Sequence, residues 1–466
     1  MSQVLILNPW IYDFAAYDLW FRPLGLLRIA SMLRTFNLSI DWLDCLDRWD
    51  SYYEQMPAGN RPRDDEYGCG KYLKKHIELP AVLQGVDRNF FRYGLPYEVV
   101  ENRLRFLDRP AVILIGTHMT YWYLGVFEMI GLVKKIWPNV PVIMGGIYAT
   151  LCTEHARQYS GADVVFSGTN MDVFLKILGQ YVNINSSTHH DFPFSFFPAY
   201  DLMHNTKSVV TQVNRGCPFR CTYCAQDLIE DRYIQRTPED VIAEFEYYQS
   251  AFGTKDIAFY DDALLINADK VAKPIFRQVI NKNMKLRFHT PNSLHVRCID
   301  QEMAYLLKES GFKTVRISLE TSNERRQKET GSKLNNEEFM LSVLYLKQAG
   351  FLDSQIQVYS MVGLPSQWPD EVKKDIDFVT HDCRVSILLA EFSPIPGTGE
   401  WLKLAKERML FSDPLWQNNS IFLQNLPGYA GNVVQQLKQY AREQNQKLRL
   451  QDMVNDKEIV LEGVVH

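Results

Sequence analysis

Three cysteines stand close together in the sequence, at Cys217, Cys221 and Cys224. On a loop that leaves a strand, thiolates at these spacings can hold three corners of one small metal cluster, and thiolates suit iron–sulfur clusters and zinc. A closed cluster or a structural zinc site takes four protein ligands, yet the next cysteine is Cys298. The spacing therefore favours a 4Fe–4S cluster with one iron left open for a ligand. The alternatives are a zinc site completed by a distant ligand such as His204, and buried structural cysteines.

The elements that must position this loop alternate regularly. Six strand-like segments are predicted at 208–216, 256–262, 286–290, 314–320, 355–363 and 385–393. Helix-like segments separate them at 238–252, 268–282, 300–310, 335–349 and 368–382. Thr237 and Pro238 are typical of a helix start, and Gly311 and Gly350 of helix ends. The pattern predicts a partial (βα)6 barrel over residues 206–400, with parallel strands and right-handed crossovers.

Polar or turn-forming residues follow most of these strands. In barrel folds the chemistry gathers where strands end and loops begin, so these positions are expected to form one site. They are the cysteine loop, Asp261 and Asp262, His289 to Asn292, Glu320, Gly363 to Pro365, and Pro394 to Gly397.

The cysteine loop resembles that of the radical S-adenosylmethionine superfamily, whose pattern is CxxxCxxC with an aromatic residue, here Tyr223, before the last cysteine. Four further segments fit the family in order and at the expected strands. They are Phe259-Tyr-Asp-Asp-Ala-Leu264, Ile317-Ser-Leu-Glu-Thr321, Tyr359-Ser-Met-Val-Gly-Leu-Pro365 and Ser393-Pro-Ile-Pro-Gly-Thr398. The resemblance covers roughly residues 206 to 400.

The resemblance implies a mechanism and a set of contacts. S-adenosylmethionine would chelate the open iron, and one electron from the reduced cluster would break its carbon–sulfur bond. The resulting 5′-deoxyadenosyl radical would take a hydrogen atom from a substrate. The implied cofactor-binding residues are Tyr223 beside the cluster, Asp261 and Asp262 for the amino group, Ser318 and Glu320 for the ribose, and Gly363 and Pro365 near adenine. The alternative for each carboxylate is an ordinary loop or cap residue.

His289, Asn292 and Arg297 follow the third strand of the predicted barrel. Two interpretations stay open for them. They cap and pack the strand end, or they contact the methionine carboxylate or the substrate.

Residues 1–180 predict a separate α/β domain. Strands are expected at 4–7, 40–45, 111–116, 141–146 and 163–168, with helices between most of them. This pattern predicts a doubly wound parallel sheet whose ligands lie beyond the carboxyl ends of its strands. Residues 46–107 are too long for a plain connection and are expected to form an insertion or cap. Residues 181–205 are expected to be a linker.

An open sheet before such a barrel is similar to the cobalamin-binding domain of the cobalamin-dependent branch of the superfamily. The implied cobalamin contacts are Gly145, Gly146 and Gly168, because glycines let the backbone approach a large ring closely. The Asp-x-His-x-x-Gly motif of the usual axial histidine is absent from the sequence. His118 is either a ligand or, by default, a structural residue, and the aromatic run 121–123 is expected to be core. A degenerate scaffold without cobalamin is the alternative for the whole domain.

Composition excludes several classes. With 46 % apolar and 23 % charged residues and a net charge of -5, the chain is neither fibrous nor an evident nucleic-acid binder. No apolar run is long enough to cross a bilayer, and the N-terminus lacks a basic leader, so a cytoplasmic protein without membrane contact is expected.

An electron donor such as flavodoxin or ferredoxin is the partner that the resemblance implies. The extension 401–466 is expected to be mostly helical, with residues 456–465 as a last strand or an ordered tail.

Three functions fit these observations. The first is a cobalamin-dependent radical S-adenosylmethionine enzyme, plausibly a methyltransferase acting on an unactivated carbon. The second is a radical S-adenosylmethionine enzyme for another transformation, with a degenerate N-terminal domain. The third is a non-catalytic, metal-stabilised binding protein. No motif identifies the substrate.

Overall fold

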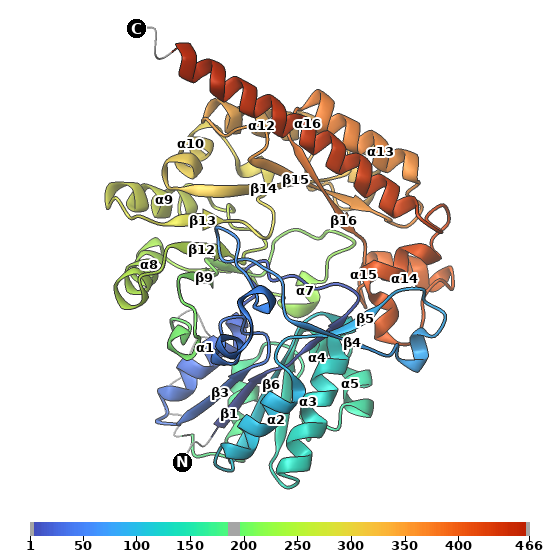
Figure 1. Cartoon of the computed structure of the whole chain (residues 1–466). Helices are drawn as coiled ribbons and strands as arrows, with labels where there is room; N and C mark the ends of the chain where they lie inside the picture. The colour runs from blue at the N-terminus through green and yellow to red at the C-terminus, as the bar shows by residue number, and fades with distance from the viewer. Residues whose placement is uncertain (1–3, 185–195, 463–466) are drawn as a thin grey trace. The chain divides into compact units, whose positions relative to one another are not determined.

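The structure, a computed structural model, describes residues 4–184 and 196–462 (Figure 1). The chain forms two compact units. The first comprises the chain up to Val209 together with Leu228–Glu230 and Phe411–Asn418, and the second comprises the remainder. The segment Phe411–Asn418 is thus part of the N-terminal unit although it follows the second unit's strands in sequence. Its Asp413 accepts a hydrogen bond from the Tyr123 hydroxyl at 3.0 Å, and Asn418 Nδ2 donates to Asp13 Oδ1 at 2.9 Å.

The N-terminal unit contains the predicted five-stranded parallel sheet. Its strands lie in the order β3-β1-β6-β7-β8, and neighbouring strands pair in parallel. The strands are β1 (Val4–Asn8), β3 (Ile40–Asp44), β6 (Val112–Thr117), β7 (Val142–Gly146) and β8 (Val164–Val165). The helices are α1 (Leu24–Arg34), α2 (Tyr97–Phe106), α3 (Tyr123–Ile136), α4 (Ile147–Leu151), α5 (Thr153–Tyr159) and α6 (Met171–Leu178). The strand order reverses between β1 and β6, which is where such sheets bind ligands.

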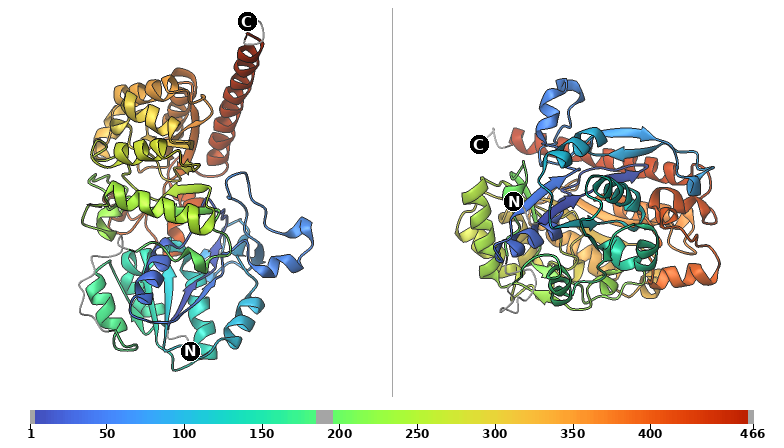
Figure 2. Two further views of the ribbon diagram at one scale, coloured as in Figure 1. Left: turned by 90° about the vertical axis from the view of Figure 1, so that its left-hand side faces the viewer. Right: turned by 90° about the horizontal axis from the view of Figure 1, so that it is seen from below.

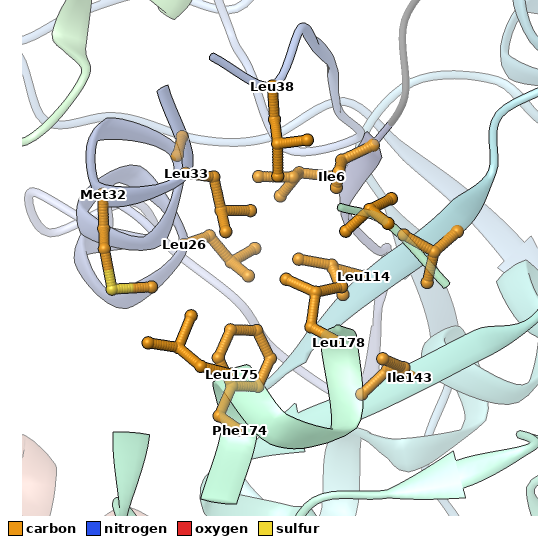
Figure 3. Close-up of a cluster of buried hydrophobic side chains, with 14 of the residues drawn as sticks. Ile6, Leu26, Met32, Leu33, Leu38, Leu114, Ile143, Phe174, Leu175 and Leu178 are labelled. Carbon is orange, nitrogen blue, oxygen red and sulfur yellow. The ribbon is translucent and has the colours of Figure 1, made fainter. Parts of the chain in front are cut away.

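Helices α1 and α6 bury their apolar faces on this sheet (Figure 3). Leu26 and Leu33 of α1 meet Phe174 and Leu178 of α6 over Leu114. Each such side chain contributes about 1.5–3 kcal/mol when fully buried. The core therefore fixes the strands whose carboxyl ends carry the polar residues described below.

The insertion 46–107 is more than a cap. Its strands β4 (Lys74–Ile77) and β5 (Phe90–Tyr93) join β2 (Ile11–Asp13) in an antiparallel sheet of order β2-β5-β4. Of the predicted linker, residues 185–195 lie outside the described residues. Ala199 and the 3-10 turn Tyr200–Leu202 pack against the core of the N-terminal sheet.

The second unit contains a six-stranded sheet of order β16-β15-β14-β13-β12-β9. The strands are β9 (Ser208–Thr211), β12 (Asp256–Phe259), β13 (Arg287–His289), β14 (Phe312–Glu320), β15 (Ile356–Val362) and β16 (Ser386–Glu391), each inside or overlapping a predicted segment. The helices are α7 (Gln226–Ile229), whose last two residues belong to the N-terminal unit, α8 (Pro238–Phe252), α9 (Ala272–Asn281), α10 (Gln301–Glu309), α11 (Glu324–Glu329), α12 (Asn336–Gln348) and α13 (Pro369–Asp377). This confirms the α/β class with parallel strands, whereas closure into a partial barrel stays a prediction.

Local signals explain several boundaries. The Thr237 side chain accepts from the Asp240 N–H, so it caps α8 as predicted, and Gly311 and Gly350 take positive φ after α10 and α12. The predicted strand 208–216 is wrong beyond Thr211. Residues Asn214–Arg215 form β10, which pairs antiparallel with β11 (Ile234–Gln235). The predicted helix 368–382 changes to a π turn over Phe378–Asp382.

The C-terminal part is helical, as expected. It contains α14 (Gly399–Lys406), α15 (Asn419–Phe422) and the long α16 (Val433–Glu462), which Figure 2 shows as one continuous helix. The expectation of a last strand over 456–465 is wrong as far as Glu462, and the remaining residues lie outside the described part. Within the described ranges, no helix combines the length and the apolar run that crossing a membrane takes.

Candidate functional site

The cysteine loop is held in place by backbone contacts within the second unit. Gly216 takes φ +79°, and a Cβ there would collide with the Arg232 carbonyl oxygen, so the turn before Cys217 needs glycine. The Thr222 N–H donates to the Thr330 carbonyl at 3.2 Å. The Thr222 hydroxyl donates to Glu400 Oε1 at 2.6 Å, and the Glu400 N–H donates back to the Thr222 carbonyl. The loop is therefore positioned before any metal binds.

The three thiols are free and half-buried. Burial raises the pKa of all three, that of Cys224 to about 12; neighbouring thiols add to the effect at Cys217 and Cys224, and the charge of Glu320 adds to it at Cys221. The ammonium of Lys333 opposes this increase at Cys217 and Cys221. Among the described residues, no three His, Cys, Asp or Glu side chains are grouped to hold a single metal ion. A purely thiol donor set fits an iron–sulfur cluster, because a 4Fe–4S cluster is held by cysteine thiolates.

Glu320 and Lys333 form an ion pair beside this loop. Lys333 Nζ lies 3.3 Å from Glu320 Oε1, and the two side chains are 19 % and 16 % exposed. Burial works against the charge on Lys333, but the Glu320 carboxylate and the Cys221 thiol together raise its pKa. The Tyr223 hydroxyl hydrogen-bonds the Cys221 thiol, and burial together with the Glu320 charge raises the pKa of Tyr223. The structure thus brings the predicted residues Tyr223, Glu320 and Cys221 together.

Backbone strain marks the end of β14. Glu320 takes φ +66°, and the pairing of β14 with β15 shifts register between Ser318 and Glu320. A residue other than glycine in this region costs about 1–3 kcal/mol and is typical of functional sites. The Ser318 hydroxyl is fully buried and has no hydrogen-bond partner within the described chain. The unpaired Ser318 hydroxyl and the strained backbone of Glu320 therefore lie two residues apart at the carboxyl end of β14.

The Asp262 carboxyl group lies within electrostatic reach of the Lys333 ammonium. Its surface is exposed, yet enough protein surrounds its carboxyl group that burial raises the pKa to about 6, against the opposing charge of Lys333. Lys333 therefore interacts with Glu320, with Asp262 and with two of the thiols.

Asp261, Gly363 and Pro365 make their hydrogen bonds with other parts of the chain. Asp261 accepts hydrogen bonds from the N–H groups of Val213 at 3.0 Å and Asn214 at 2.5 Å, which turns the chain out of β9 toward the cysteines. The Gly363 N–H donates to Gln367 Oε1, and the Pro365 carbonyl accepts from Arg326. Contacts of these three residues with S-adenosylmethionine stay predictions.

The residues after the third strand have partners of their own. His289 Nε2 lies 2.9 Å from Asp256 Oδ1, and Asn292 Nδ2 donates to the Tyr260 carbonyl. Arg297 Nε lies 2.9 Å from both carboxylate oxygens of Glu338. These bonds support the packing and capping interpretation.

Sequence reasoning missed Lys333 and His295. Lys333 follows the short helix α11, and the only local signal is the preceding Gly331, which takes φ +119° against the backbone of Cys221. His295 lies six residues after β13, without a motif. Both are brought to the site by contacts that are distant in sequence.

The three predicted glycines of the N-terminal unit share the carboxyl edge of its sheet. Gly146 takes φ +109°, and a Cβ there would collide with the Thr117 carbonyl of the neighbouring strand. The Thr150 hydroxyl donates to the Gly146 carbonyl and accepts from the Gly168 N–H, each at 2.9 Å. Gly145 lies against Phe166. This edge is therefore closely packed backbone, and a role in cobalamin binding stays a prediction.

A hydrogen-bonded chain crosses the switch point of the same sheet. Asn8 Nδ2 donates to Asp44 Oδ1 at 2.6 Å, and Asn8 Oδ1 lies 3.2 Å from His118 Nε2. Burial lowers the pKa of His118 to about 4, so the ring is neutral at pH 7. These bonds favour the structural interpretation of His118. Trp122 donates to Asp13 as part of the packed interior of this unit.

We expect Asp44→Asn to remove a pH dependence of stability. Burial raises the pKa of Asp44 from 3.8 to about 7, so between about pH 4 and 7 the folded chain binds more protons than the unfolded chain. Stability then falls as pH rises through this window. Asparagine keeps the acceptor oxygen for Asn8 without the charge, so the variant should gain on the order of 4 kcal/mol at pH 8 and little at pH 4. Urea unfolding of both proteins at the two pH values measures this, and parallel profiles would contradict it.

Comparison with known proteins agrees with the site. Residues 211–379 match the profile of the Radical SAM superfamily. An uncharacterized methyltransferase of Pyrococcus horikoshii, PH0819, is 26 % identical over 375 residues, which cover 73 % of this chain and 77 % of that protein. Cytidylyl-2-hydroxyethylphosphonate methyltransferase of Streptomyces wedmorensis is 25 % identical over 484 residues, covering 89 % of this chain and 83 % of that protein.

Two solved structures share the fold. The radical S-adenosylmethionine methyltransferase TsrM from Kitasatospora setae, solved with tryptophan and an S-adenosylmethionine analogue, gives a TM-score of 0.62 at 14 % identity, over 87 % of this chain and 76 % of that one. The cobalamin-dependent S-adenosylmethionine radical enzyme OxsB, solved with aqua-cobalamin and S-adenosylmethionine, gives 0.57 at 13 % identity, over 95 % of this chain and 61 % of that one. At these identities the likeness establishes the architecture.

Proposed function

We propose that this chain, which belongs to the radical S-adenosylmethionine superfamily through residues 211–379, is a cobalamin-dependent enzyme that cleaves S-adenosylmethionine reductively and methylates an unactivated carbon. The observation that carries the proposal is the pre-positioned loop of three half-buried thiols beside the Glu320–Lys333 ion pair. Cys217, Cys221 and Cys224 would hold a 4Fe–4S cluster. That cluster supplies the single electron for breaking the carbon–sulfur bond.

Residues of this chain would bind and orient S-adenosylmethionine. The Lys333 ammonium would attract the carboxylate of S-adenosylmethionine. The nearby Asp262 carboxyl group would accept a hydrogen bond from its amino group. The fully buried Ser318 and the strained Glu320 offer groups to ribose hydroxyls. Asp261 positions the cysteine loop through the backbone of Val213 and Asn214. Holding several reactant groups at once removes part of the entropic barrier.

Cobalamin binding is assigned to the N-terminal unit. The relatives named methyltransferases and the fold shared with the structures solved with cobalamin support this assignment. Gly145, Gly146 and Gly168 stand at the carboxyl edge of the sheet, where residues without a side chain would let a large ring or its tail approach the backbone. The second candidate is a radical enzyme without cobalamin. It is favoured by the Asn8 bond to His118, which gives that histidine a structural role.

We further infer a partial (βα)6 barrel over residues 206–400, a cobalamin-binding-like domain over 1–180 and an extension over 401–466. Because the cluster needs one electron per turnover, a small reducing protein such as flavodoxin or ferredoxin is the expected partner. The cytoplasm, where such donors and reduced thiols occur, is the expected location.

Anaerobic purification tests the proposal. We expect a brown protein with about four irons per chain, whose reduction in the presence of S-adenosylmethionine yields 5′-deoxyadenosine. A bound corrinoid, identified by its visible spectrum, separates the first candidate from the second. S-adenosylmethionine labelled in its methyl group reports whether methyl reaches the corrinoid. A colourless protein that holds zinc would refute both candidates and leave a metal-stabilised binding protein.

A further inference from the structure

A cavity in the N-terminal unit is formed by residues of the insertion 46–107 and by Tyr17. Its volume is about 590 Å³, and its walls are the loop 59–65, the segment 69–74 and the Tyr17 side chain. Binding sites for small molecules usually measure about 300–1,000 Å³. The cavity is therefore large enough for a small organic ligand, and none of the residues assigned to S-adenosylmethionine or to the cluster lines it.

Hydrogen bonds at Gly70 fix the shape of this cavity. The Gly70 N–H donates to the Asp18 carbonyl, and the Asp18 N–H donates to the Gly70 carbonyl, each at 2.9 Å. A Cβ on Gly70 would lie 2.2 Å from the Arg63 carbonyl oxygen, so the loop packs directly on the glycine backbone. The buried Arg48 guanidinium donates to the same Arg63 carbonyl at 3.3 Å. The walls are thus in place before a ligand binds, which lowers the entropic cost of binding.

The lining of the cavity is positively charged. It contains four cationic side chains against two carboxylates, in a chain whose net charge is -5. The cations are Arg61, Arg63, Lys71 and Lys74. A concave surface lined by one sign of charge concentrates ions of the opposite sign.

Both carboxylates of the lining are already bound by the protein. Asp64 accepts from Arg48 Nη1 at 2.7 Å and from Trp49 Nε1 at 2.8 Å. Asp65 Oδ1 accepts from the backbone N–H groups two and four residues later, each at 2.9 Å. Their charges are therefore largely compensated by groups other than the four lining cations.

Most of the lining cations lack a polar partner. Arg61 donates to two carbonyls of the preceding turn, and Lys74 Nζ lies 4.0 Å from the centroid of the Phe91 ring. Within residues 4–184 and 196–462, the side chains of Arg63 and Lys71 form no hydrogen bond or ion pair. One guanidinium and two ammonium groups in the lining are therefore available to an anion.

We propose that this cavity binds the phosphate group of a small phosphorylated molecule. The planar guanidinium of Arg63 matches two phosphate oxygens, and Lys71 and Lys74 add point charges for a dianion. A carboxylate carries a single charge and would leave the cations in excess. The Tyr17 side chain, which is 48 % exposed, is available to pack against the organic part of the ligand. The proposal is independent of the proposed function, because this binding needs neither the cluster nor S-adenosylmethionine.

Calorimetric titration of the full-length, anaerobically purified protein with phenyl phosphate tests the proposal. Low ionic strength is needed, since salt screens exposed charges. We expect saturable binding by the wild type. The double variant Arg63→Gln/Lys71→Gln should bind about 10- to 100-fold more weakly, because it loses charge-assisted hydrogen bonds. It should melt at the wild-type temperature, since neither side chain is bonded within the described chain.

Lys75→Gln is the matched control. Lys75 is exposed and follows Lys74 on β4, but it does not line the cavity. Side chains alternate along a strand, so Lys75 points to the opposite face. This variant loses the same charge and should bind phenyl phosphate as the wild type does.

Four results would overturn the proposal. The first is a wild-type protein that does not bind phenyl phosphate, and the second is equal binding by the double variant. The third is benzoate binding as tightly as phenyl phosphate, which would show that any anion suffices. The fourth is a short RNA that binds more tightly than phenyl phosphate and is lost in the double variant, which would make the cavity part of a nucleic-acid surface.

Discussion

Cys221→Ala is expected to lose its iron and to reduce 5′-deoxyadenosine formation to background, a loss on the order of 10³-fold or more. Only two thiols would remain on the loop, and Cys221 is the thiol that the Tyr223 hydroxyl contacts. Iron and sulfide content, followed by product formation under a chemical reductant, measure the effect. Undiminished product formation would refute the assignment of this cysteine.

Cys298→Ala is the matched control. Cys298 is half-buried like the three loop cysteines and is the next cysteine along the chain. If one iron is left open for S-adenosylmethionine, this variant keeps its iron and its activity. If Cys298→Ala also loses iron, the cluster is closed by four cysteines, and the proposed docking of S-adenosylmethionine on it fails.

Lys333→Met has the second largest expected effect. The ammonium lies among Glu320, Asp262 and two thiols, so its removal leaves neighbouring negative groups without their cation. Hydrogen bonds to charged groups contribute about 1.5–3 kcal/mol, which corresponds to a loss of S-adenosylmethionine affinity of about 10- to 100-fold. Equilibrium dialysis with the anaerobic protein measures this, and iron content should stay near that of the wild type because all three thiols remain.

Lys328→Met removes an exposed lysine from the neighbouring helix α11 and serves as the control. It should bind S-adenosylmethionine as the wild type does. Equal affinities in the two variants would show that Lys333 only balances charge within the folded chain. Loss of iron in Lys333→Met alone would instead make it a determinant of cluster assembly.

Much of the secondary structure could be predicted from local sequence signals. Strands β1, β6 and β7 of the N-terminal sheet are short, mostly apolar runs, and such runs can be recognised without knowledge of tertiary contacts. The cap at Thr237 is equally local. The grouping of Tyr223 and Glu320 with Cys221 was predictable because the carboxyl ends of parallel strands meet at one edge.

The remaining features depend on contacts distant in sequence. Asp261 accepts hydrogen bonds from the backbone N–H groups of Val213 and Asn214, which lie 48 and 47 positions earlier in the chain. The insertion's strands β4 and β5 pair with each other, and β2, which precedes the insertion in the chain, completes their sheet. Lys333 and His295 belong to no recognisable motif. The hydrogen bond of Lys333 to Glu320 and the stacking of His295 on Phe219 become visible only in the structure.

The return of Phe411–Asn418 to the N-terminal unit bears on the order of synthesis. Domains commonly fold from the N-terminus as the chain leaves the ribosome. Here Asp13, whose buried carboxyl group has a raised pKa, receives the hydrogen bond from Asn418, which adds to the one from Trp122, only after every strand of the described residues has been translated. Until then, the Asp13 carboxyl group of the nascent N-terminal unit lacks one of its hydrogen-bond donors. A truncation that ends after the sheet would therefore yield a less stable product than its compactness suggests.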